Sequence, residues 1–326
     1  MKILQKQPGK EFTVLNLTDP QLSDAEWADG HGHRLILEYT VKELIKRVNP
    51  SLITISGDLA WAGHNLSYDS LAKLIDSFGI PWAPVWGNHD NQGGAECVDS
   101  VADRYMTYTN CIYEKGDTTL GNGNYVIRIE ENGEPISAII MADSHDREPF
   151  IDANGNESVA WAKLTAIQGE WIESVANELK ADGYRDATLL LHIPIYAYRQ
   201  ASAAVYKDGL DLMAISNEES QGESCWNDGY TDSTGVQYEE VSSYPGEDGM
   251  FDIIKKSGII NRVIAGHDHI NNWMIKYDGI DLIYSLKTGA GCYWRQNLSG
   301  GTTLTFTDSK NATIRHEYVD ASHIVN

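Results

Sequence analysis

Five short, largely apolar runs in this chain each end at side chains that bind metal ions in proteins. The junctions, in chain order, are Asp19-Pro20-Gln21 after residues 14–17, Gly57-Asp58 after residues 52–55, Gly87-Asn88-His89-Asp90 after residues 84–86, His192 after residues 189–191, and Gly266-His267-Asp268-His269 after residues 263–265. A short apolar run bounded by turn residues is typical of a buried strand. Each junction therefore predicts a buried strand that ends in a metal-binding side chain.

The first three junctions belong to an alternating pattern of strands and helices. Apolar residues recur at helical spacing over residues 37–48, and a second helix is predicted over residues 68–78. Two successive crossovers of this kind imply parallel strands. In open α/β sheets the functional groups gather at the carboxyl ends of the strands, so we expect Asp19, Asp58 and Asn88 to lie close together.

The middle of the chain predicts a second set of elements. Residues 91–123 are expected to be irregular and to cover the site. Strands are expected over residues 124–130 and 136–141, and Asn132-Gly133 between them is a strong hairpin signal. Apolar residues at helical spacing over residues 164–179 predict a helix before the fourth junction.

The C-terminal part of the chain is divided less clearly. Residues 196–249 are polar with weak periodicity, and a loop of that length in a compact domain is usually functional. A short helix is expected over residues 251–256. Alternating segments then predict antiparallel strands of a second sheet, over residues 273–277, 282–286, 302–307 and 313–318. We expect a single domain over residues 1–326, with an irregular insertion at about residues 196–250.

Composition argues against several kinds of partner. The 326 residues carry a formal net charge of -22, whereas nucleic-acid binding depends on clustered Lys and Arg. The sequence has neither the long apolar run of a membrane span nor the apolar core of a signal peptide. Its four cysteines lack close pairs, which predicts neither a disulfide framework nor a thiolate zinc site. We expect a soluble cytoplasmic protein without nucleic-acid or membrane partners.

In this order the five junctions resemble the calcineurin-like metallophosphoesterase superfamily. Its pattern is Asp-x-His, Gly-Asp, Gly-Asn-His-Asp/Glu, a lone His and Gly-His-x-His, and the similarity covers residues 14–269. The details are similar to a branch of cytosolic phosphatases related to purple acid phosphatases. Gln21 departs from the pattern because the family usually has His there. The resemblance implies an α/β fold, a four-layer α/β/β/α sandwich of two mixed sheets flanked by helices.

The resemblance also implies two divalent or mixed-valence metal ions, with manganese, iron and zinc as candidates. It makes Asp58 the ligand that both ions share. Gln21 is either an extra ligand through its amide oxygen or a neighbour that holds a water molecule. Because an amide oxygen is a harder and poorer ligand than imidazole, a Gln21 ligand would favour oxygen-loving ions. The other implied ligands are Asp19 and His269 on the first metal, and Asn88, His192 and His267 on the second.

The same resemblance gives His89 and Asp90 roles in the reaction. His89 is expected beside the substrate phosphate, where it stabilises the transition state or protonates the leaving oxygen. Asp90 is expected to orient the His89 imidazole. True purple acid phosphatases have a Tyr three residues after the shared Asp, and here that residue is Trp61, which cannot bind a metal. We therefore expect a protein without the purple colour.

The expected activity is hydrolysis of a phosphate monoester by in-line attack of a metal-bridging hydroxide, on a small phosphorylated substrate or a phosphoprotein. A phosphodiesterase acting on cyclic nucleotides or lipid head groups would use the same ligands. A non-catalytic metal-binding scaffold is a third alternative, although it would not need an acid such as His89. Some aromatic residues either stack a base or sugar or simply pack: Trp226, Tyr230, Tyr293 and Trp294.

Overall fold

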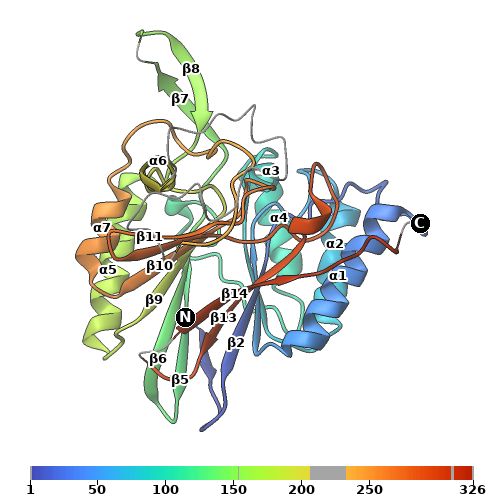
Figure 1. Ribbon diagram of the computed structural model, residues 1–326, viewed down its shortest axis with the longest axis horizontal. Coiled ribbons are helices and arrows are strands. Elements are labelled where there is room, and N and C mark those ends of the chain that lie inside the picture. Colours follow the sequence, from blue (N-terminus) through green and yellow to red (C-terminus); the bar gives the residue numbers. More distant parts are fainter. Residues whose placement is uncertain (1, 153, 206–232, 310–311, 325–326) are drawn as a thin grey trace.

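Two β-sheets packed face to face form the centre of the protein, and helices cover their outer faces (Figure 1). The computed structural model describes residues 1–326 except 1, 153, 206–232, 310–311 and 325–326. One sheet is covered by α1 (Gly32–Val48), α2 (Asn65–Asp76) and α4 (Ala95–Tyr105), and the other by α5 (Ala166–Ala181) and α7 (Met250–Ser257). This arrangement is the predicted four-layer sandwich.

A five-stranded sheet contains the first three junctions. Its order is β14-β13-β2-β3-β4. β2, β3 and β4 are parallel, which confirms the two predicted crossovers, and β13 pairs antiparallel with both β2 and β14. Its strands are β2 (Phe12–Leu17), β3 (Leu52–Ser56), β4 (Trp82–Val85), β13 (Gly300–Phe306) and β14 (Ala312–Tyr318).

A seven-stranded mixed sheet contains the last two junctions. Its order is β1-β5-β6-β9-β10-β12-β11. β9 pairs in parallel with β6 and β10, so the strands that precede His192 and His267 end at the same edge. Its strands are β1 (Lys2–Gln5), β5 (Tyr125–Glu131), β6 (Glu134–Met141), β9 (Ala187–Leu190), β10 (Ile260–Ala265), β11 (Met274–Tyr277) and β12 (Ile280–Tyr284).

Both faces of the seven-stranded sheet are buried. Along β6, Ile139 and Met141 belong to the core between the two sheets, whereas Ala138 and Ile140 belong to the core beneath α5 and α7. This alternation follows from the two-residue period of a strand. Burial of each such aliphatic side chain contributes about 1.5–3 kcal/mol, so apolar packing fixes the sheets and thereby the strand ends.

The predicted Asn132-Gly133 hairpin is confirmed. β5 and β6 pair antiparallel, and both turn residues have a left-handed backbone, with φ of 56° at Asn132 and 84° at Gly133. A two-residue hairpin turn needs this conformation at both positions because it matches the twist of the strands. The Asn-Gly pair therefore determined the turn locally.

Residues 91–123 are not irregular throughout, so that prediction is wrong. They contain α4 and the 3-10 helix η1 (Thr118–Leu120), and the short helix α3 (Asn88–Asn91) precedes them. α4 buries Val98, Val101, Ala102 and Tyr105, which recur at helical spacing. The polar residues between them obscured a helical signal that is present in the sequence.

The prediction that the last four strands complete one sheet is also wrong. β11 and β12 extend the seven-stranded sheet, because β12 pairs in parallel with β10, whereas β13 and β14 extend the five-stranded sheet. Strand pairing depends on tertiary position, which alternation alone does not specify. β1 was not expected either. The predicted insertion begins with helix α6 (Ala197–Val205), and its residues 206–232 lie outside the described residues.

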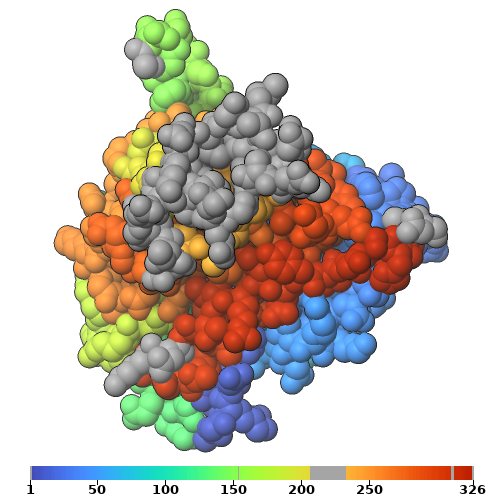
Figure 2. Space-filling model, viewed as in Figure 1, coloured from blue at the N-terminus to red at the C-terminus, as the bar shows by residue number. Residues whose placement is uncertain are grey.

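One hairpin that the sequence reading missed projects from the sandwich (Figures 1 and 2). It consists of β7 (Arg147–Ile151) and β8 (Glu157–Trp161), which pair antiparallel. Asn154-Gly155 lies between these strands and is a recognisable hairpin signal. Among the described residues, the structure has no helix with the length and apolarity to span a bilayer.

Candidate metal centre

The strands that precede Asp19, Asp58 and His267 each turn sharply at that residue. These three residues have a left-handed backbone, with φ of 54°, 50° and 76°. Such a conformation is uncommon outside glycine and costs of order 1–3 kcal/mol. The surrounding structure maintains it, and the turns direct the three side chains to one buried location.

Glycines before the functional residues allow the chain segments to approach closely. A Cβ at Gly87 would lie 2.2 Å from Asp58 Oδ1, and a Cβ at Gly266 would lie 2.0 Å from Thr18 Oγ1. Both distances are far below van der Waals contact. The glycines of these junctions are therefore required by the packing of one junction against another.

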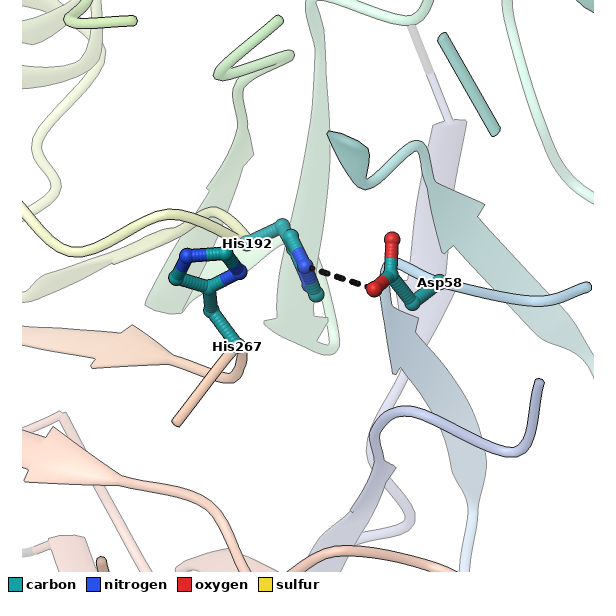
Figure 3. A group of neighbouring side chains, drawn as sticks. All are labelled: Asp58, His192 and His267. Carbon is teal, nitrogen blue, oxygen red and sulfur yellow. Dashed lines mark ion pairs between the residues drawn. The ribbon is translucent and has the colours of Figure 1, made fainter. Parts of the chain in front are cut away.

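Two groups of side chains at this location have metal-ligand geometry. Asp58, His192 and His267 form one, and Asp19, Asp58 and His269 form the other; within each group one ligand atom per residue lies within 4.8 Å of the others. All five side chains are buried. His192 and Asp58 point toward each other (Figure 3), with 3.3 Å between Nε2 and Oδ2. Asp58 is common to both groups, as the predicted shared ligand should be.

Backbone carbonyls fix the orientation of two of the imidazoles. His192 Nδ1 lies 2.8 Å from Ser56 O, and His269 Nδ1 lies 2.8 Å from Tyr293 O. A carbonyl only accepts hydrogen bonds, so each Nδ1 donates, which leaves Nε2 as the metal-binding atom of the neutral ring. His192 Nε2 is 3.0 Å from Asn88 Oδ1, and His269 Nε2 is 3.2 Å from Asp19 Oδ1.

Burial and charge together set the protonation of the cluster. Burial lowers the pKa of His192, but the Asp58 and Asp19 carboxylates outweigh it and raise the pKa to about 10. Burial and the charge of His192 lower the pKa of His267 to about 3. Burial raises the pKa of Asp58, but the charge and hydrogen bond of His192, together with the charge of His89, outweigh burial and lower that pKa. The His192 proton thus balances the carboxylates, a role that a bound cation would take over.

Several buried polar atoms have no hydrogen-bond partner among the described residues. Both side-chain amide atoms of Gln21, Nδ2 of Asn88 and Nε2 of His267 are in this state. An unpaired buried polar atom costs about 1–3 kcal/mol, and Gln21 is 0% exposed. Oxygen and imidazole donors of this kind fit manganese, iron or zinc. The residues present therefore fit a pair of metal ions.

His89 lies at the edge of the cluster, and Asp90 does not orient its ring. The His89 side chain is 22% exposed, and its Nε2 is 3.9 Å from Asp58 Oδ2. Its Nδ1 lies 3.0 Å from Gln92 Oε1, and its ring is 4.1 Å from that of Trp61. The His89 ring is therefore oriented by Gln92 and Trp61, and not by Asp90 as predicted.

The Asp90 carboxylate instead organises the backbone beneath the site. It accepts hydrogen bonds from Gly87 N (2.7 Å), Leu59 N (3.1 Å) and Tyr68 Oη (2.7 Å). These hydrogen bonds therefore connect the turn that carries Asn88 with the turn that carries Asp58. The prediction failed because sequence adjacency to His89 says nothing of where a side chain on a helical turn points.

The aromatic candidates fall into different environments. Tyr293 stacks on the imidazole of His269, with 4.1 Å between ring centroids, and is 47% exposed. Trp294 packs against the small cluster around Ile36. Trp226 and Tyr230 lie outside the described residues.

The sequence reading missed Lys287 and Trp161. Lys287 is buried, and its Nζ donates to the Asp19 backbone carbonyl at 2.7 Å. Trp161, from β8, contacts the His267 ring with 4.4 Å between centroids. Lys287 carries no sequence signal, whereas the Asn154-Gly155 turn would have indicated the hairpin that bears Trp161.

A family model for calcineurin-like phosphoesterases matches residues 12–271. Two similar proteins are from Arabidopsis thaliana. Probable inactive purple acid phosphatase 28 is 24% identical over 79% of this chain and 63% of its own length. Probable inactive purple acid phosphatase 14 is 27% identical over 77% of this chain and 61% of its own length. Phosphatase DCR2 of Saccharomyces cerevisiae is 28% identical, covering 92% and 51%. The chain thus spans between half and two thirds of the length of these relatives.

Solved structures share the fold at low sequence identity. A dimetal phosphatase from Danio rerio has a TM-score of 0.54 at 12% identity, with 94% of this chain and 98% of that chain covered. Purple acid phosphatase PPD1 from yellow lupin seeds has a TM-score of 0.55 at 13% identity, with 96% and 53% covered. The family match over residues 12–271 extends across all five junctions. The chain belongs to the calcineurin-like phosphoesterase family.

Proposed function

We propose that this protein hydrolyses phosphate monoesters with the help of two metal ions. The observation that carries the proposal is the position of Asp58, which belongs to two buried groups of ligand atoms at once. A carboxylate common to two such groups is suited to hold two ions side by side.

The chain's own hydrogen bonds leave one oxygen of each carboxylate available. Thr18 Oγ1 donates to Asp19 Oδ2 at 2.7 Å, and the His89 backbone N donates to Asp58 Oδ1 at 2.9 Å. Asp19 Oδ1 and Asp58 Oδ2 then face the imidazoles. We assign Asp19, Gln21 and His269 to the first metal, Asn88, His192 and His267 to the second, and Asp58 to both. When bound, such ions activate water and neutralise charge on a phosphate oxygen.

We assign His89 to the substrate phosphate. Its ring is part-exposed at the edge of the buried ligand cluster, and Gln92 holds Nδ1 so that Nε2 faces the Asp58 side. A protonated imidazole in this position donates a hydrogen bond to the phosphate and can pass its proton to the leaving oxygen. Trp61 packs on the ring and restricts its rotation.

The test is an esterase assay after loading with Mn²⁺, Zn²⁺ or Fe²⁺. We expect hydrolysis of p-nitrophenyl phosphate that exceeds hydrolysis of bis-p-nitrophenyl phosphate, and loss of both activity and bound metal in Asp58→Asn. A preference for the bis-ester would identify a phosphodiesterase on the same ligands.

A metal-binding protein without esterase activity is favoured by one observation. Two of the similar proteins are named as probable inactive purple acid phosphatases. These names describe those two proteins. Full metal occupancy with no turnover of either ester, for all three metals, would establish this alternative in place of the enzyme.

A further inference from the structure

The β7–β8 hairpin stands at the edge of the candidate metal centre. Its strands project from the body of the molecule (Figures 1 and 2), but its base reaches the ligands, because Trp161 contacts the ring of His267. Asp146, the residue before β7, is close enough to Arg147, His89 and Asp58 for their charges to act on its carboxylate. The base of the hairpin is therefore part of the surroundings of the candidate metal centre.

Arg147 carries a positive charge at this base. It pairs with Trp161 across the two strands, and its guanidinium carbon lies 4.2 Å from the centre of the Trp161 ring. The guanidinium and the His267 imidazole thus contact the same indole. Stacking on an aromatic face holds a guanidinium in place while its N–H groups remain free to bind a ligand.

The Arg147 side chain is exposed and makes no hydrogen bond or ion pair with any of the described residues, although its charge acts on the neighbouring Asp146 carboxylate. Acidic residues outnumber basic ones in this chain, 47 to 25, and several arginines elsewhere pair with carboxylates, including Arg34, Arg104 and Arg262. An unpaired guanidinium beside a metal centre is suited to an external anion.

The other face of the hairpin is attached to the body of the protein. Phe150 packs edge-on against Tyr244, with 5.6 Å between centroids. Lys163 lies over the same Tyr244 ring at 3.8 Å and pairs with Glu148 at 3.5 Å. Since side chains alternate between the faces of a strand, this attachment leaves the face of Arg147 and Trp161 uncovered by those contacts.

We propose that Arg147, supported by Trp161, binds a second anionic group of the substrate, a phosphate or a carboxylate, while the metal centre holds the scissile phosphate. The inference rests on the proposed phosphoesterase function and narrows it to esters of acidic alcohols. Arg147 is a specificity residue in this scheme and takes no part in bond breaking.

Matched substrates test the subsite. Glycerol 3-phosphate and 3-phosphoglycerate differ by a carboxylate, and fructose 6-phosphate and fructose 1,6-bisphosphate differ by a phosphate. We expect wild type to favour the more anionic member of one or both pairs, and the pair that is discriminated identifies the anion. Arg147→Gln should raise KM for that member by about tenfold or more, the range for a charged hydrogen bond, with kcat and metal content unchanged.

Two further variants separate specific contact from net charge. Lys163→Gln removes the same charge from the attached side of the hairpin and should leave the preference intact. Arg147→Lys keeps the charge but loses the planar fork, so it should restore the preference only in part. p-Nitrophenyl phosphate, which lacks a second anion, should be hydrolysed equally by all of these proteins.

The proposal is overturned if wild type shows no preference within either pair, or if Arg147→Gln and Lys163→Gln change it equally. Equilibrium binding of the same four esters to metal-loaded protein distinguishes this failure from failure of the proposed function. If the protein hydrolyses none of the esters but binds the more anionic ester more tightly, and Arg147→Gln removes this preference, the subsite is supported and the esterase function is refuted.

Discussion

Gln21 has a fully buried side-chain amide, and neither of its polar atoms has a hydrogen-bond partner among the described residues. Its backbone N donates to Asp58 O at 3.1 Å, which attaches it to the turn that carries the shared carboxylate. A buried amide without partners is expensive, and coordination of the first metal through Oε1 would compensate for that cost.

The first residue-scale prediction concerns this amide. Gln21→His should increase the affinity for the first metal by about tenfold, because imidazole is a better donor than an amide oxygen. Gln21→Leu, a substitution of similar volume, should decrease the affinity for this metal. Competition against a chelator of known affinity measures both effects, and equal metal affinity in wild type and Gln21→Leu would show that Gln21 is not a ligand.

The second concerns the part-exposed imidazole of His89. His89→Ala should lower kcat by about 10²–10⁴, the usual contribution of a general acid, and should leave metal content unchanged. His64→Ala is the control, because His64 is likewise part-exposed and lies by Asp24, 3.8 Å away. Parallel loss of metal and activity in His89→Ala would mean that this imidazole is a ligand or structural.

A third residue-scale prediction concerns colour. Trp61 stands three residues after Asp58, where the resemblance to purple acid phosphatases would place a metal-binding Tyr, and its indole lies against His89. Iron-loaded protein should therefore lack visible absorption of the purple type. A visible spectrum of the iron-loaded protein measures this, and a purple sample would contradict the assignment.

At the scale of elements, His316 of β14 links β13 to the segment that precedes β11. His316 Nε2 lies 2.7 Å from Asn272 O, and its Nδ1 lies 3.0 Å from Thr302 Oγ1. The Thr302 hydroxyl accepts from Ser285 Oγ and Leu286 N, so its own hydrogen is free for Nδ1. The neutral ring fits this network, whereas a protonated ring would have no acceptor at Nδ1.

This network predicts the direction of a pH effect on stability. Burial lowers the pKa of His316 to about 4, below its value of about 6.5 in the unfolded chain. As pH falls from about 6.5 toward 4, the unfolded chain binds a proton that the native state does not, so stability decreases. Between pH ~7.5 and ~5 the free energy of unfolding should decrease by about 2 kcal/mol through His316.

Urea unfolding at the two pH values measures this loss, and His316→Gln supplies the comparison. Other groups titrate in both proteins, so the His316 contribution is the difference between their pH dependences. The variant should lose about 2 kcal/mol less than wild type over this interval. Equal losses would show that folding does not change the pKa of His316.

At the scale of the whole molecule, we expect metal binding and folding to be coupled. The carboxyl ends of β2 and β3 in one sheet and of β9 and β10 in the other lie close together, and Asp19 and Asp58 are each 1% exposed there. The ligands come from separate strands of both sheets, so unfolding disperses them and abolishes the site. Any ion that binds the native state alone then stabilises it, by about 2.7 kcal/mol at a hundredfold excess over Kd.

Removal of metal should therefore lower the melting temperature by several degrees. Calorimetry of the metal-loaded protein with and without EDTA measures the change, and added Mn²⁺ should reverse it. Asp58→Asn should melt at nearly the same temperature in both conditions. A wild-type melting temperature that does not respond to EDTA would argue against a metal-coupled fold.

Local chemistry in the sequence determined much of this protein. The apolar runs specified β2, β3, β4, β9 and β10, and the residues that follow them specified the ligand types. Asn132-Gly133 determined its own turn, because a type I′ backbone depends on those two residues alone. The order of the junctions was enough to indicate the family and its four-layer fold.

Only the tertiary structure decided which distant groups meet. Asp90 was assigned to its neighbour His89 but binds Gly87, Leu59 and Tyr68. The last four strands divide between two sheets, and Trp161 reaches His267 across 106 residues of sequence. Strand ends and turns depend on local backbone preference, whereas side-chain contacts between separate elements depend on how the sheets pack, which no single segment encodes.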